Sequence, residues 1–124
     1  MSAKIIGIDI PWFDELIKLP SLPKNNRSCR IDSLGYAGGG KVSTALVAAA
    51  RLQIDVKLLA VLGKGAKGNF LLEDFLFNNV DCSSIRLEEN YQDGFSLILS
   101  DDATNGRRIF YKYDDEALGL KIDE

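Results

Sequence analysis

Histidine is absent from this 124-residue sequence, and cysteine and proline are scarce. Without histidine the chain lacks the commonest general base and the commonest metal ligand, so acid–base chemistry must come from carboxylates or other groups. The two cysteines, Cys29 and Cys82, lie far apart and have no metal-type spacing, so we expect two buried thiols in a cytoplasmic protein and not a disulfide. We therefore predict no metal site.

Long apolar runs and excess positive charge are also missing. No segment reaches the roughly 18 to 20 apolar residues that a membrane span requires, and the first apolar run is too short for a signal peptide. The 15 lysines and arginines against 18 acidic residues give a formal charge of -3, which argues against a nucleic-acid surface. The length suits one domain, or a piece of one, with neither membrane nor nucleic acid as a partner.

The sequence does contain an alternation of strands and helices. Lys4 to Ile10 and Val56 to Leu62 are continuous apolar runs, which are typical of buried central strands in a parallel sheet. A helical segment precedes the second run, and the order strand, helix, strand predicts a βαβ unit of the α/β class. Further strands are predicted near residues 14–36, at Cys82–Leu87, at Gly94–Ser100 and at Arg107–Tyr113, with a hairpin turn at Asn105-Gly106 and a second helix after Gly68.

The rest of the chain is organised around Tyr36 to Leu52, where three consecutive glycines precede an alanine-rich segment. The apolar residues of this segment follow the spacing of one helical face, and they are Val42, Ala45, Leu46, Ala49 and Leu52. Gly38, Gly39 and Gly40 would leave bare backbone amides at the start of the helix, against which a ligand can sit. The alternative is that the glycines only let the helix pack closely on a sheet.

Two glycine patterns point to nucleotide binding. Gly35 to Lys41 fits G-x-x-x-x-G-K, but Val42 replaces the hydroxyl that would bind magnesium, which argues against a phosphate loop. Gly63 to Gly68 fits G-x-G-x-x-G between a strand and a helix, and Glu88 or Glu89 lies about 20 residues further on. That fingerprint normally follows the first strand and here follows a later one, so a small dinucleotide-binding domain stays an alternative.

Two aspartates lie close to the first predicted strand. Asp9 lies within it and Asp14 follows it, and a carboxylate at the carboxyl end of a strand can hold ligand hydroxyls. Capping or solvation is the commoner fate of an isolated aspartate near a turn. The remaining acidic turns show no recurring ligand spacing and are predicted to be solvated surface; they contain Asp101, Asp102, Asp114, Asp115 and Glu116.

Gly39 to Leu52, the strand at Val56 to Leu62 and the turn at Gly63 to Gly68 together resemble the N-terminal signature of the ribokinase-like (PfkB) family of carbohydrate kinases. That signature is a Gly-Gly turn, a helix ending in Ala-Arg-Leu, a strand, and then Val-Gly-x-Asp-x-x-Gly. The likeness extends from Ile5 to about Tyr113 and includes the late hairpin.

The resemblance implies a ribokinase-like, Rossmann-like parallel sheet with helices and a small β lid, in which residues 1–124 are the N-terminal part of one incomplete domain. The lid strands would lie at about 14–36 and 94–113, and a sugar or nucleoside acceptor would lie between the sheet and the lid. Carried over residue by residue, the acceptor-binding candidates are Asp14, Gly39, Gly40, Lys41 and Thr44.

Three residues depart from the family pattern. Thr44 stands where the family usually has a substrate-binding asparagine, and Gly65 stands where the second motif has its aspartate. Trp12 occupies the position that the simplest spacing gives to the first aspartate, so Asp14 needs a short insertion. The sequence therefore does not name the sugar or nucleoside.

The family's catalytic base lies in a C-terminal Gly-Ala-Gly-Asp turn, beside which ATP binds, and this sequence contains no such turn. We therefore expect no catalytic residue and no ATP or Mg²⁺ site in this chain, although the intact family enzyme uses both, and we expect the chain alone to be inactive. The alternative is a non-catalytic remnant that binds a ligand or forms a homodimer through the lid strands.

Overall fold

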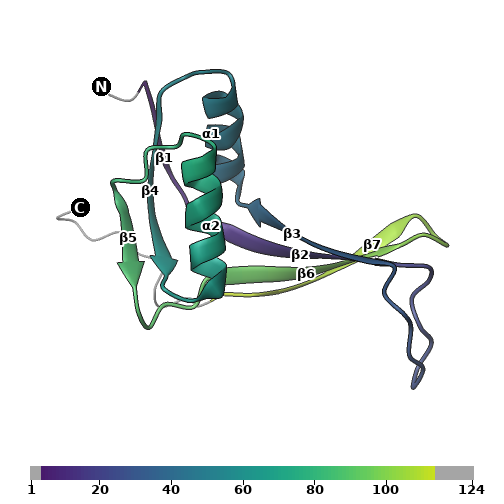
Figure 1. Cartoon of the computed structure of the whole chain (residues 1–124). Helices are drawn as coiled ribbons and strands as arrows, with labels where there is room; N and C mark the ends of the chain where they lie inside the picture. Colours follow the sequence, from purple (N-terminus) through teal and green to yellow (C-terminus); the bar gives the residue numbers. More distant parts are fainter. Residues whose placement is uncertain (1–3, 114–124) are drawn as a thin grey trace.

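The computed structural model describes residues 4–113, which form two β-sheets and two α-helices (Figure 1). The acidic tail, with the predicted surface residues Asp114, Asp115 and Glu116, lies outside the described residues. The elements are β1 (Ile5–Ile8), β2 (Trp12–Leu19), β3 (Ser33–Gly39), α1 (Lys41–Arg51), β4 (Val56–Gly63), α2 (Ala66–Phe77), β5 (Ile85–Glu88), β6 (Gly94–Asp101) and β7 (Gly106–Lys112).

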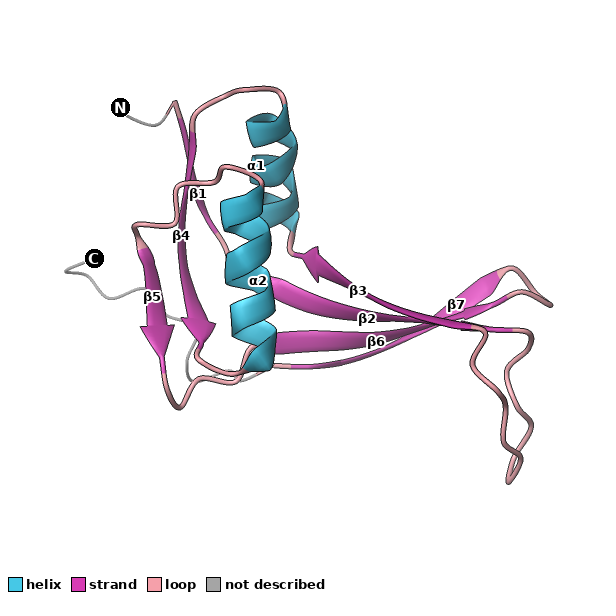
Figure 2. Ribbon diagram, in the orientation of Figure 1, coloured by secondary structure: helices cyan, strands magenta, loops and turns pink. Residues whose placement is uncertain are grey.

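The first sheet is parallel and has the order β1-β4-β5, and both helices lie on one of its faces (Figure 2). Alternate residues of a strand point to the same face, so every second side chain of β4 enters the core beneath the helices. The β4 side chains in this core are Val56, Leu58, Ala60 and Leu62, and they share it with Leu46 of α1 and with Leu71 and Phe75 of α2. The predicted parallel α/β arrangement is confirmed.

Strand β1 differs from its prediction. Lys4 to Ile10 was expected to be a buried central strand, but β1 is shorter, and Ile6 and Ile8 are each 60% exposed. Among the described residues β1 pairs only with β4, and its outward face lies opposite the helices. Gly7 is the buried residue of β1, because Val42 and Leu46 of α1 pack directly over it.

Helix α1 is confirmed, but the face that it buries is rotated from the predicted one. Its buried residues are Ser43, Leu46 and Ala50, whereas Ala45 is exposed. Leu52 is 75% exposed because it lies at the C-terminal cap, where the helix has ended. Helix propensity predicted the element, and the direction from which the sheet approaches decided its buried face.

The second sheet has the order β3-β2-β6-β7 and projects away from the helices (Figures 1 and 2). Strand β3 begins at Ser33, later than predicted, and runs through Gly39, so Gly38 and Gly39 belong to a strand. Of the three consecutive glycines, Gly40 is the one with a positive φ, at 105°. The Asn-Gly hairpin is confirmed between β6 and β7, with Asn105 at φ 53°.

The two sheets share one core where β2 passes α2. Phe13 of β2 is buried and meets Phe70 of α2 edge-on, with 5.3 Å between the ring centroids. In the described part of the chain, no helix has the length and apolar character needed to cross a membrane. The two cysteines are free and half-buried, not fully buried as expected.

Candidate functional site

Asp9 closes the N-terminus of α1. Its Oδ2 accepts hydrogen bonds from the backbone N–H and from the Oγ of Ser43, each at 2.7 Å. A side chain at Gly40 would place its Cβ only 2.7 Å from the same oxygen. Asp9 therefore acts as a helix cap supplied from another segment, and its negative charge occupies the place where a phosphate loop would hold an anion. This geometry argues against the phosphate-loop interpretation.

Asp14 lies against the last glycine of β3. A Cβ on Gly39 would lie 2.7 Å from Asp14 Oδ2, so the carboxylate approaches the backbone more closely than any other residue at position 39 would allow. Burial raises the pKa of Asp14, and a hydrogen bond with Ser96 opposes this effect. The structure thus brings two of the predicted acceptor residues into direct contact.

An aromatic corner surrounds Asp14 on the same face of the second sheet. The indole N–H of Trp12 donates a hydrogen bond to Ser96 Oγ, and the Trp12 ring lies 6.5 Å from the ring of Tyr111 and 5.9 Å from that of Tyr113. Residues that pair across neighbouring strands point to one face, and both Asp14 and Tyr111 pair with Ser96. Sequence reasoning missed Ser96 and Tyr111, because only the strand register reveals them.

Lys41 and Thr44 are both exposed at the start of α1. Thr44 and Gly39 line a cavity of about 350 Å³ between β3, α1 and α2, and neither Asp14 nor Lys41 lines it. The five predicted residues therefore lie near one another around the β3–α1 connection, but they do not all face one cavity.

The second glycine turn holds a carboxylate of its own. Asp93, which is 8% exposed, accepts hydrogen bonds from the N–H of Gly63 at 3.0 and 3.1 Å. A Cβ on Gly68 would lie 2.0 Å from the carbonyl oxygen of Gly63 and 2.7 Å from Asp93 Oδ2. Burial raises the pKa of Asp93, while hydrogen bonds from Gly63 and Gly68 and the charge of Lys67 oppose the rise.

This carboxylate argues against the dinucleotide alternative. A pyrophosphate in the Gly63–Gly68 turn would compete with Asp93 for the same amides and would meet its charge. The expected ribose acceptors are also engaged elsewhere: Glu88 lies 2.8 Å from Arg86 Nε, and Glu89 lies 3.4 Å from Lys64 Nζ. Gly63 and Gly68 are explained by the close approach of Asp93 and of backbone carbonyl oxygens, without a bound phosphate.

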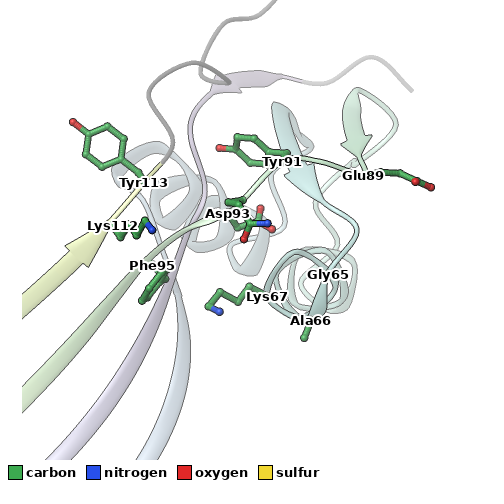
Figure 3. Close-up of a pocket in the computed structure, with 10 residues that line it drawn as sticks. Gly65, Ala66, Lys67, Glu89, Tyr91, Asp93, Phe95, Lys112 and Tyr113 are labelled. Atoms are coloured by element: carbon green, nitrogen blue, oxygen red, sulfur yellow. The ribbon is translucent and has the colours of Figure 1, made fainter.

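A second and larger cavity, of about 710 Å³, lies at the start of α2 (Figure 3). Its walls come from the start of α2, from residues 89–93 and from the adjoining ends of β6 and β7, and we call it the junction cavity. None of the five predicted acceptor residues lines it. Sequence patterning pointed to part of this wall, the Gly63–Gly68 turn and Glu89, but not to the residues of β6 and β7 that complete the cavity.

The acidic and thiol groups elsewhere are structural in the described range 4–113. No group of three or more acidic or cysteine side chains is placed there to hold a metal ion. Asp101 accepts hydrogen bonds from Ala103 N–H and Thr104 Oγ1 and so shapes the hairpin turn. Burial, with the charge of Asp81 as a second cause, raises the pKa of the Cys82 thiol to about 11, so this thiol is not an activated nucleophile.

Comparison with known proteins assigns the fold and the family. The model of the pfkB family of carbohydrate kinases matches residues 8–123. Ribokinase of Staphylococcus aureus (strain COL) is 24% identical over 114 residues, which are 91% of this chain and 37% of that protein.

Two solved structures share the fold. The structure of Arabidopsis thaliana ribokinase complexed with ribose and ATP superposes with a TM-score of 0.78 at 17% identity, over 94% of this chain and 41% of that one. The nucleoside kinase of Methanocaldococcus jannaschii gives a TM-score of 0.74 at 19% identity, over 87% of this chain and 36% of that one. The described residues are therefore an incomplete ribokinase-like domain.

The chain thus belongs to the pfkB family of carbohydrate kinases, and it spans little more than a third of the length of the relatives that it matches.

Proposed function

We propose that this chain is the N-terminal, acceptor-binding part of an ATP-dependent carbohydrate kinase that transfers the γ-phosphate of ATP to a hydroxyl of a sugar or nucleoside. The observation that carries the proposal is the contact between the Asp14 carboxylate and the backbone at Gly39. A carboxylate beside exposed backbone can accept hydrogen bonds from neighbouring ligand hydroxyls while the backbone amide donates to others. Family membership gives this corner its expected ligand class.

Each of the predicted residues would make a different contact with the acceptor. Asp14 would accept hydrogen bonds from acceptor hydroxyls, and Gly39 would let the acceptor approach the backbone closely. Lys41 and Thr44, exposed at the start of α1, would supply a positive charge and a hydroxyl. Gly40 would act indirectly, since its open side is filled by Asp9.

The phosphoryl-transfer step needs groups that this sequence does not contain. In the intact enzyme a base would take the proton of the acceptor hydroxyl, and Mg²⁺ with backbone amides would stabilise the charge on the transferred γ-phosphate. The chain alone would orient the acceptor and would not phosphorylate it.

Titration calorimetry with ribose, other pentoses and hexoses, and nucleosides tests this proposal. We expect saturable binding of one acceptor class, and we expect Asp14→Asn to weaken it by about tenfold or more, because a carboxylate accepts stronger hydrogen bonds than an amide does. Asp102→Asn is the matched control, since Asp102 lies at an exposed turn and forms an ion pair with Lys18 at 3.6 Å. Equal affinities of the Asp14 variant and the parent chain would contradict the proposal, as would phosphorylation by the chain alone in an ADP-release assay.

A second candidate function is the association of two copies of the chain through the lid strands, and the open edges of the second sheet favour it. Strands β3 and β7 each have one sheet neighbour among the described residues, and they expose Tyr36, Ile109 and Phe110 by 52%, 46% and 58%. Open strand edges with apolar side chains favour pairing between chains. Sedimentation velocity over a range of concentrations tests this candidate: a monomer at every concentration would contradict it.

A further inference from the structure

The junction cavity is a separate site whose walls differ in chemistry. Its volume of about 710 Å³ lies within the range typical of small-molecule sites. Figure 3 shows side chains from α2, from the segment before β6 and from the end of β7 arranged around one space. None of the five predicted acceptor residues lines it, although Tyr113 also contacts Trp12 in the aromatic corner near Asp14.

One wall is positive. Ala66 and Lys67 open α2, and the first backbone N–H groups of a helix have no partner within the helix. The cap residue Gly65 supplies no side-chain hydrogen bond to them. The Lys67 ammonium lies 4.8 Å from the centroid of the Phe95 ring, and Lys112 lines the cavity from β7. Asp93 already lies at the start of α2 and accepts a hydrogen bond from Gly68 N–H, so the two lysines are what favour an anionic group in the cavity.

Another part of the wall is aromatic. Tyr91 is 7% exposed, so it is a fixed side chain of the wall, and Phe95 and Tyr113 line the same space. Aromatic side chains bind planar rings through their faces and edges. Asp93, at the inner end, already accepts the Gly63 N–H, so its charge directs an anionic group away from itself and toward the lysines.

Gly65 leaves space that the fold does not use. A Cβ placed on Gly65 would meet nothing within 4 Å, and its backbone, at φ -79° and ψ -174°, is open to any residue. Gly63 and Gly68 in the same turn are required by the close approach of Asp93, but no such contact explains Gly65. The open side of Gly65 is part of the cavity wall.

We propose that the junction cavity binds an aromatic phosphate of the size of a nucleoside monophosphate. The phosphate lies between Lys67 and Lys112, on the side of the cavity away from Asp93, and the planar ring lies against Tyr91, Phe95 and Tyr113. The hydroxyl groups between ring and phosphate face Asp93, at the acidic end of the cavity. This binding is independent of the acceptor site at Asp14.

The test uses AMP as the probe, with the whole 124-residue chain, followed by calorimetry and by ligand-observed NMR. We expect AMP to bind at least about tenfold more tightly than adenosine or inorganic phosphate alone, since each of these fills only one part of the site. Lys112→Ala should weaken AMP binding by about tenfold because it removes one positive charge from the cavity wall. Since Lys112 is exposed, the unfolding free energy should stay unchanged.

Gly65→Phe should abolish AMP binding by filling the cavity, and its unfolding transition should stay close to that of the parent because its Cβ has open space. Gly35→Phe is the matched control: a Cβ on Gly35 also meets nothing within 4 Å, and Gly35 lies on β3, outside the junction cavity. Asp14→Asn should leave AMP affinity unchanged, which separates this site from the proposed acceptor site. Unchanged AMP binding in Gly65→Phe, or phosphate bound as tightly as AMP, would overturn the proposal.

Discussion

The two helices both begin at glycines, and in both places an aspartate from a distant segment lies against the backbone. Asp9 reaches Ser43 in the first turn of α1, and Asp93 reaches Gly63 before α2. The two arrangements differ in what they leave open. Asp9 binds the amide and the hydroxyl of Ser43 alone, whereas Asp93 binds the amide of Gly63 at the end of β4 and that of Gly68 in α2, and it leaves Gly65 lining a large cavity.

The comparison shows that a glycine-rich turn before a helix is not in itself a phosphate site. A Cβ on Gly40 or on Gly68 would lie 2.7 Å from a carboxylate oxygen of the same chain; the positive φ of Gly40 and the carbonyl oxygen of Gly63, 2.0 Å from a Cβ on Gly68, also require glycine. Glycine patterns of this kind record a close approach, and the approaching group can belong to the protein as well as to a ligand.

The strongest way to break the second turn is Gly68→Ala. Its Cβ would lie 2.0 Å from the carbonyl oxygen of Gly63, which is backbone and cannot move aside, so we expect a loss of about 3 kcal/mol in unfolding free energy. Urea unfolding followed by circular dichroism measures it. Gly65→Ala is the matched change in the same turn and should cost less than about 1 kcal/mol. Similar losses in the two variants would show that the close approach of the Gly63 carbonyl does not explain the glycine at position 68.

Breaking the first turn should have a smaller effect. Asp9→Ala removes two hydrogen bonds of 2.7 Å from a carboxylate to Ser43 and leaves the start of α1 uncapped, so we expect a loss of about 2 kcal/mol. Thermal unfolding monitored by circular dichroism measures this loss. Asp102→Ala, which removes an ion pair between two half-exposed side chains, should change stability by less than about 0.5 kcal/mol. If both variants behave alike, Asp9 is not a helix cap of this strength.

The elements could be predicted from the sequence because their signals are local. The alternation of apolar runs predicted the strand, helix, strand order, and Asn105-Gly106 predicted the hairpin between β6 and β7. The exposure of β1 could not be predicted, since Ile6 and Ile8 look like core residues whether or not a neighbour covers them. Periodicity shows that a strand can be buried and does not show what buries it.

The site was less predictable because it depends on contacts between distant segments. Capping was the commoner fate expected for an aspartate near a turn, and Asp9 does cap a helix, although that helix lies two strands further along the chain. Asp93 was missed because it lies in an unpatterned segment 30 residues from Gly63. One signal was available: Gly65 stands where the family motif has an aspartate, and a turn that lacks its own carboxylate can receive one from elsewhere in the chain.

The buried position of Asp93 should appear in the pH dependence of stability. Burial raises the pKa of Asp93 in the folded state, so its contribution is fully present below the unfolded pKa and is lost as pH rises through the folded pKa. The difference in unfolding free energy between the parent chain and Asp93→Asn should therefore fall as pH rises from about 4 toward neutrality.

Asp81 provides the opposite case for this measurement. Hydrogen bonds from Ser83 lower the pKa of the exposed Asp81, so its contribution is present above the unfolded pKa and is lost as pH falls through the folded pKa. The difference in unfolding free energy between the parent chain and Asp81→Asn should therefore rise with pH. A flat profile for Asp93→Asn would show that its carboxyl is not destabilised by burial.

The smallest expected effect is at Gly35, a glycine that no other group approaches, in contrast to the glycines beside a carboxylate. A Cβ on Gly35 would meet nothing within 4 Å, and Gly35 lies in strand β3, where a β-branched residue loses less freedom on folding than glycine does. Gly35→Thr should therefore raise the unfolding free energy by about 0.5 kcal/mol, measured by urea unfolding. Gly39→Thr, four residues along the same strand, should lower it, because its Cβ would displace the Asp14 carboxylate. Opposite signs at these two positions would separate a glycine that serves a carboxylate contact from one that does not, whereas two gains would mean that Asp14 moves aside freely.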